Sequence, residues 1–173
     1  MKHNPLLAFV LFSLACAPSL SAADQQPADQ AGVRPAEASF LRAAATTLRE
    51  MKEQAESRKM SGAAVVAFIP GDKATAWVSR MQVVGSFVLG KSNVLGVAYT
   101  KAAEMADTLQ NSGGGSRGPY KGEFGYKGGV IQKTSSGYLL AVFSGGKSED
   151  DVAVAQAGLA KLVKEMGDEA ASK

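Results

Sequence analysis

Three segments of the chain carry apolar residues every three or four positions, which is the period of an amphipathic helix. These segments cover residues 35–59, 93–109 and 148–166. Pro35 suits the first turn of the first segment, because an N–H at that position has no helical partner and its loss costs nothing. Glycines follow the second segment, as they should follow the end of a helix. We therefore expect three helices, each with one buried face.

Short apolar runs rich in β-branched residues lie between the predicted helices. Residues 63–69 and 74–81 flank a Pro-Gly-Asp turn, which predicts a β-hairpin. Residues 130–143 predict a second hairpin that turns at a Ser-Ser-Gly sequence. Residues 83–92 fit either a strand or irregular chain. Apolar runs this continuous favour strands that helices cover on at least one face, and hence an α+β fold.

The segment between the second helix and the second hairpin is unusually rich in glycine. Residues 113–129 contain eight glycines. Ordering such a segment costs much backbone entropy, because glycine loses more conformational freedom than any other residue. The composition predicts either a mobile loop or a lid or pocket wall, and the sequence leaves both open.

The N-terminus has the layout of a secretory signal peptide. Lys2 precedes an apolar run over residues 5–20, and Ser21 and Ala23 suit the −3 and −1 positions of a cleavage site. We expect cleavage after Ala23 and a periplasmic or secreted protein. The apolar run is too short to cross a bilayer, so stable membrane insertion is not expected.

The rest of the chain predicts one domain after a short tether. Residues 24–34 are polar and interrupted by proline and glycine, which indicates a flexible tether. Residues 35–173 are long enough for one domain with a real core, and no repeat is visible. The formal net charge is only +3 and the basic residues are scattered, so a nucleic-acid partner is not expected.

The predicted mature chain lacks histidine and cysteine, on which many enzyme mechanisms depend. His3 and Cys16 are the only histidine and cysteine, and both lie in the predicted signal peptide. This excludes disulfides, zinc sites of the usual type, and Ser-His-Asp or Cys-His catalysis. We predict no catalytic residue and no protein metal site. Any turnover would depend on a bound cofactor.

A Gly-Gly-Lys-Ser sequence precedes the last predicted helix and is similar to a phosphate-binding loop. The loop motif needs glycine where Ala141 stands, and residues 149–151 are acidic and would repel a triphosphate. The acids are better explained as partners of the positive end of the helix dipole. Ser148 and Asp151 have the spacing of a capping box, so we expect Ser148 to cap the helix.

The C-terminal third closely resembles the GlcG/HbpS family of haem-binding and haem-degrading domains. The family has a glycine pair, which is Gly128-Gly129 here. It also has a Ser-Gly followed by an Asp, which here are Ser144-Gly145 and Asp151. Its Val-Ala-x-Ala-Gly-Leu block corresponds to residues 154–159. Arg80-Met81 and Lys101-Ala102 resemble further family positions more loosely. The resemblance implies that residues 35–173 form a profilin-like sandwich, with an antiparallel sheet of about five strands flanked by helices. It also implies assembly into a homo-oligomer.

Two positions depart from the family pattern. Glu104 stands where the family usually has threonine, and the segment before Gly128 is not rich in proline. Both lie where the family's pocket is expected, so the resemblance speaks more directly for the fold than for the activity.

The first functional hypothesis is a haem or tetrapyrrole binding protein that assists haem degradation. Without histidine, the candidate axial ligands are Tyr99, Tyr120, Tyr126, Tyr138, the methionines and the lysines. Tyrosine and methionine are known to ligate haem. Arg80, Lys101 or Lys127 would pair with the propionates. The candidate ligands and pocket residues are Tyr126, Tyr99, Met105, Arg80, Lys101, Glu104, Gly128 and Gly129.

Two alternatives stay open. One is a non-catalytic module for a small anionic metabolite, in which Arg80 and Lys101 converge on one pocket beside the Gly128 and Gly129 amides. The other is an interaction protein whose helices form an oligomer interface, which would leave a broad apolar surface on the monomer.

Overall fold

The computed structural model describes residues 30–170. The predicted signal peptide, its cleavage after Ala23 and residues 24–29 of the predicted tether lie outside the described residues. No helix in the described part of the chain is both long and apolar enough to cross a membrane.

The described residues form three helices and six strands. In chain order they are α1 (Gln30–Ser57), β1 (Gly62–Pro70), β2 (Val78–Val84), β3 (Val88–Leu89), β4 (Ser92–Asn93), α2 (Val94–Thr108), β5 (Gly129–Lys133), β6 (Gly137–Ser144) and α3 (Ser148–Ala170).

Four strands form one antiparallel sheet in the order β2-β1-β6-β5. The two predicted hairpins supply its halves, and the central strands β1 and β6 join them. The short strands β3 and β4 pair only with each other and form a separate ribbon. The predicted α+β class is confirmed, and the architecture is consistent with a profilin-like sandwich, with four strands in the main sheet where about five were expected.

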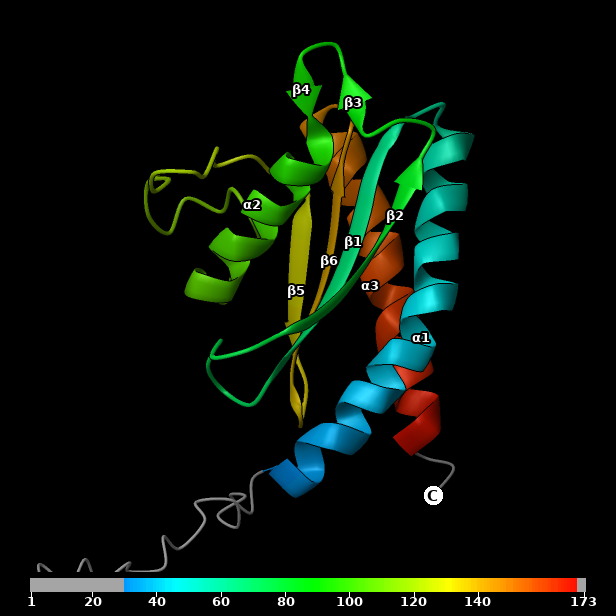
Figure 1. Ribbon diagram of the computed structural model, residues 1–173, viewed down its shortest axis with the longest axis vertical. Coiled ribbons are helices and arrows are strands. Elements are labelled where there is room, and N and C mark those ends of the chain that lie inside the picture. Colours follow the sequence, from blue (N-terminus) through cyan, green and yellow to red (C-terminus); the bar gives the residue numbers. More distant parts are fainter. Residues whose placement is uncertain (1–29, 171–173) are drawn as a thin grey trace, which may run out of the picture.

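Helices cover both faces of the sheet (Figure 1). Helices α1 and α3 pack on one face, and α2 packs on the other. Strand β1 is therefore buried on both sides, and its side chains alternate between two cores. The first core contains Phe40, Met51, Val66, Phe68, Phe143 and Leu162, and the second contains Val65, Ile69, Met105, Leu140 and Val142. Each of these larger side chains contributes about 1.5–3 kcal/mol when it is fully buried.

Two predicted boundaries are wrong. Helix α1 begins at Gln30, so Pro35 lies inside the helix rather than in its first turn, and one backbone hydrogen bond is lost there. Strand β2 begins at Val78, not at residue 74, because the last pair that β2 makes with β1 joins Val78 to Phe68. Residues 71–77 instead form a loop with a local turn, in which the Thr75 amide donates to the Lys73 carbonyl.

Candidate functional site

Two cavities with both polar and apolar lining residues adjoin the N-terminal half of α2. A cleft of about 550 Å³ lies between this half helix, the β3–β4 ribbon and the turn before α3. A second cavity of about 460 Å³ shares the lining residues Ser92, Val97 and Tyr126 with the first, so the two adjoin. We call this combined space the groove.

The groove has an apolar wall and a basic rim. Leu89 from the ribbon and Val94 and Val97 from α2 supply the wall. Lys127 and Lys147 lie exposed at the rim, and neither makes an ion pair within residues 30–170. This combination suits a ligand that has an apolar body and negative charge at its edge.

Tyr126 stands between the two cavities of the groove. Its ring stacks on Phe124 with centroids 5.4 Å apart, and both side chains are about half exposed, at 53% and 52%. No other group in the described part of the chain forms a hydrogen bond with the Tyr126 hydroxyl. The ring is thus held by stacking while its oxygen stays available to a ligand.

Arg117 fixes the glycine-rich loop that carries Tyr126. Its guanidinium makes a bidentate contact with Glu123 at 2.6 and 2.9 Å and a further contact with Asp107 on α2 at 2.8 Å. It also lies 3.8 Å from the centroid of the Tyr120 ring. These bonds hold the pKa of Glu123 down at about 2, chiefly through the hydrogen bonds from Arg117. The loop is therefore a bonded pocket wall, and the sequence reasoning missed the arginine that makes it one.

We expect Arg117→Gln to loosen the loop without unfolding the protein, because the substitution removes the ion pairs that hold the loop and touches no core residue. Amide hydrogen exchange should accelerate several-fold over residues 113–127 and stay unchanged in β1 and β6. Arg58→Gln is the control, since the Arg58 guanidinium, just after α1, bonds to Gln54 of α1, far from the loop in sequence. Unchanged exchange in the loop would show that Arg117 does not order it.

The same loop should loosen in acid. Because the folded pKa of Glu123 lies below its unfolded value, the bond to Arg117 stabilises the protein above the unfolded pKa. That stability is lost as the pH falls toward about 2. Hydrogen exchange measured down the pH scale, corrected for the intrinsic rate, reports the change.

Lys101 and Asp151 form a buried ion pair below the groove. Their side chains are 3% and 5% exposed, and Nζ lies 2.8 Å from Oδ2. The ammonium also donates to the Phe143 carbonyl at 2.9 Å. Burial lowers the pKa of Lys101 and raises that of Asp151, while their attraction opposes both shifts. The pair joins α2 to α3, so Lys101 is already committed inside the protein.

Asp151 also bonds to the glycine turn before α3, whose sequence is similar to a phosphate-binding loop. Its Oδ1 accepts a hydrogen bond from the Gly146 amide at 2.8 Å. The predicted capping box with Ser148 is wrong, because the Asp151 carboxylate reaches back to the glycine turn and across to Lys101 instead. An amide that a phosphate would need is thus occupied by the protein's own carboxylate.

Glu104 and the glycine pair hold the loop from its other end. The Glu104 carboxylate accepts from the Gly113 amide at 2.8 Å, at the start of the glycine-rich segment. Ser112, which the sequence reasoning also missed, accepts from the Gly129 amide at 2.9 Å. A side chain at Gly128 or Gly129 would collide with Lys101 or Met105 respectively. These predicted pocket residues thus make internal contacts beside the groove.

The other predicted residues lie away from the groove. Met105 is fully buried in the second core and is not available to a ligand. Tyr99 packs against that core and lies 6.5 Å from Trp77, centroid to centroid. Of the predicted tyrosine and methionine ligands among the described residues, only Tyr126 lines the groove; of the predicted lysines, Lys91, Lys101, Lys127 and Lys147 line it.

The predicted convergence of Arg80 and Lys101 is wrong. Arg80 pairs with Val66 in the sheet and so shares the face that α1 and α3 cover. Lys101 comes from α2, on the opposite face. The two cations line no common cavity: Lys101 lines the groove and Arg80 does not, and the Lys101 ammonium is already bonded to Asp151 and the Phe143 carbonyl.

Comparison of the chain with models of protein families, with curated proteins and with solved structures found no match. The resemblance to the GlcG/HbpS family therefore stays a prediction. Within residues 30–170, no cluster of three or more acidic, histidine or cysteine side chains is placed to hold a metal ion.

Proposed function

We propose that the groove binds haem, or a similar planar tetrapyrrole with carboxylate groups, with Tyr126 as the axial ligand. The observation that carries the proposal is the Tyr126 hydroxyl, which has no hydrogen-bond partner among the described residues and belongs to a side chain that lines two adjoining cavities. The resemblance in the C-terminal third supports the same ligand class.

The chemistry of the groove fits such a ligand. A phenolate oxygen is a known ligand of haem iron. The apolar wall of Leu89, Val94 and Val97 suits the macrocycle, and the Lys127 and Lys147 ammonium groups suit its propionates. The stacked Phe124 ring keeps Tyr126 in place. Bound haem would supply redox chemistry at iron, and the chain's own part is to hold and orient it.

Lys101 has a supporting role in this proposal. Its ammonium is saturated by Asp151 and the Phe143 carbonyl, so it positions the floor of the groove and leaves the propionates to the exposed lysines. The metabolite-binding alternative loses its predicted pair of cations, because Arg80 lies on the other face of the sheet. The haem proposal needs neither residue as a ligand. We also propose, from the sequence, that the protein lies outside the cytoplasm and forms a homo-oligomer.

A haemin titration followed by visible absorption tests the proposal. We expect a saturable Soret shift at about one haem per chain, with bands typical of tyrosinate ligation. Tyr126→Phe should abolish those bands, because it removes the oxygen and keeps the ring. Tyr120→Phe is the matched control, since Tyr120 is another exposed tyrosine of the same loop and lines neither cavity. A Soret shift that Tyr126→Phe leaves unchanged would overturn the assignment of the ligand.

A further inference from the structure

We propose that the outer edge of β2 pairs antiparallel with the same edge of a second copy of the chain, across a twofold axis. The sheet order β2-β1-β6-β5 leaves β2 and β5 as the two edges, and the protein itself blocks only one of them. The pairing rests on the proposed homo-oligomer and gives it a defined contact. It does not depend on haem binding, because no residue of β2 lines the groove.

The edge at β5 is closed by the segment that follows α2. The Gly129 amide donates to Ser112 Oγ at 2.9 Å, and the Ile131 amide donates to Asn111 Oδ1 at 3.0 Å. The Gly129 carbonyl accepts from the Ser112 amide at 3.2 Å. These bonds occupy the outward groups that a further strand would need, which is one way in which proteins protect a sheet edge.

The outward backbone groups of β2 have no such partners. The Gly71 amide donates to the Ser136 carbonyl and continues the ladder between β1 and β6, so the odd-numbered residues of β1 bond to β6. The even-numbered residues of β1 therefore bond to residues 78, 80 and 82 of β2. The N–H and C=O groups of three residues of β2 then point outward, and none is bonded to another described group: Ser79, Met81 and Val83.

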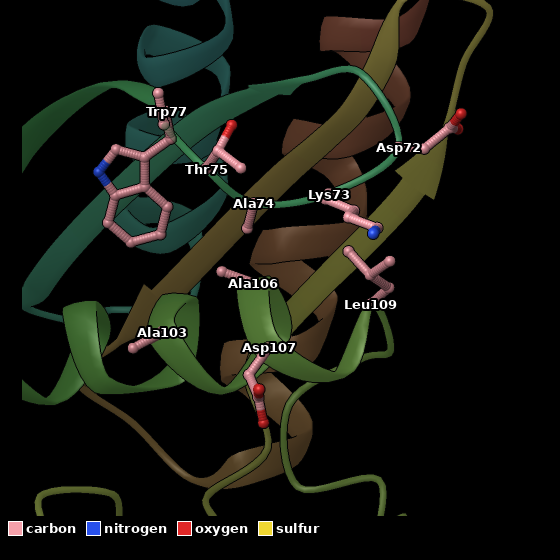
Figure 2. A pocket seen from close by; sticks show the side chains of 10 residues that line it. Asp72, Lys73, Ala74, Thr75, Trp77, Ala103, Ala106, Asp107 and Leu109 are labelled. Atoms are coloured by element: carbon pink, nitrogen blue, oxygen red, sulfur yellow. The ribbon is translucent and has the colours of Figure 1, made fainter.

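Both faces of the sheet leave room beside this edge. On the face that α1 and α3 cover, the Arg80 side chain is exposed. On the other face, α2 packs on β1, β5 and β6. A cavity of about 650 Å³ separates the C-terminal half of α2 from the loop before β2, and Trp77 at the end of that loop lines the cavity (Figure 2). The half-buried side chains of Met81 and Val83 lie on the α2 face, where a second copy would cover them.

The strand also lacks the features that keep edge strands from pairing. Its seven residues pair with β1 in an unbroken register, so β2 has no bulge, and it contains no proline. Arg80 is its only charged residue. The edge is therefore long, regular and nearly uncharged, and its donors and acceptors fit another strand.

The sequence of β2 favours a second copy of itself as that strand. With Met81 on the twofold axis, Ser79 lies opposite Val83 of the other copy, and all the outward groups pair in about six hydrogen bonds. Arg80 then lies opposite Gln82 of the other copy, whose side-chain oxygen accepts from a guanidinium. A register centred on Arg80 would place two like charges opposite each other, and one centred on Gln82 would leave Ser79 without a strand residue opposite it.

The dimer and its location are measured together. We would follow sedimentation of the purified protein from micromolar to submillimolar concentration, and amide hydrogen exchange over the same range. We expect a monomer–dimer equilibrium in which the amides of residues 79, 81 and 83 exchange more slowly as the dimer fills. An oligomer in which these amides exchange freely would overturn this interface and leave the homo-oligomer standing. A protein that stays monomeric, or slow exchange that does not depend on concentration, would overturn both the pairing and the choice of a second copy.

Two substitutions at Gln82 test the register. Gln82→Glu places a carboxylate opposite Arg80 of the other copy and should tighten the dimer about two- to tenfold, because the pair occurs twice by symmetry. Gln82→Arg places like charges opposite each other and should weaken the dimer by a similar factor. Gln132→Glu, at an exposed position of the blocked β5 edge, is the matched control and should change nothing. Circular dichroism checks that each variant is folded. Effects of the same sign in the two Gln82 variants, or an equal effect at Gln132, would overturn the pairing.

Discussion

Replacing Lys101 with methionine should lower the free energy of unfolding by about 3–5 kcal/mol at neutral pH. The substitution keeps the volume of the side chain but leaves the Asp151 carboxylate buried without its counter-charge. It also leaves the Phe143 carbonyl without the ammonium that bonds it. Denaturant unfolding followed by circular dichroism measures the change.

A double-mutant cycle separates the pair from its surroundings. Asp151→Asn keeps a carbonyl oxygen for the Gly146 amide, so in the Lys101→Met background it should restore much of the lost stability. Lys52→Met is the control, because its exposed pair with Glu56 is worth only about 0.3–0.5 kcal/mol. Similar losses at Lys52 and Lys101 would contradict the assigned role of the buried pair.

The loss caused by Lys101→Met should shrink in acid. Burial already raises the pKa of Asp151, and removing the nearby ammonium raises it further. A carboxyl group whose folded pKa exceeds its unfolded value favours the folded state below the unfolded pKa, and that contribution is lost as the pH rises through the folded pKa. The stability of the variant should therefore approach that of the wild type as the pH falls toward 4.

The sequence predicted the elements well because their signals are local. Apolar period and turn residues correctly indicated three helices and two hairpins, and the hairpins gave the outer pairings of the sheet. The error at residues 74–77 has a different origin. There the paired length of β1 and the packing of Trp77 decide the boundary, and neither can be read from the local residue types.

The site was predicted less completely because its contacts are not local. Lys101 and Asp151 are fifty residues apart and come from helices on opposite faces of the sheet. The resemblance drew attention to both, but their roles as partners follow only from the fold. Glycine content could not distinguish a mobile loop from a pocket wall, because the answer depends on Arg117 meeting both Glu123 and Asp107. The sequence alone does not show which arginine will meet two carboxylates in the folded chain.

Gly128→Ala should destabilise the protein by about 2–6 kcal/mol, a range that includes the loss expected for Lys101→Met. Gly128 has a φ of 125°, and holding a side chain in such a conformation costs about 1–3 kcal/mol. A Cβ there would also lie 2.5 Å from the Lys101 Nζ and 2.8 Å from the Phe143 carbonyl oxygen. Overpacking of this kind costs about 1–3 kcal/mol more, and here it pushes apart the ion pair itself.

Gly122→Ala separates these two contributions. Gly122 lies in the same loop at a φ of 98°, but a Cβ there would meet nothing within 4 Å. Its substitution should therefore cost only the backbone strain, about 1–3 kcal/mol, and the excess at Gly128 measures the packing against Lys101 and Asp151. Thermal and denaturant unfolding of both variants give the comparison. Equal losses would mean that glycine is needed at residue 128 for its backbone conformation alone, whereas the expected excess would show that the absent side chain makes room for the buried pair.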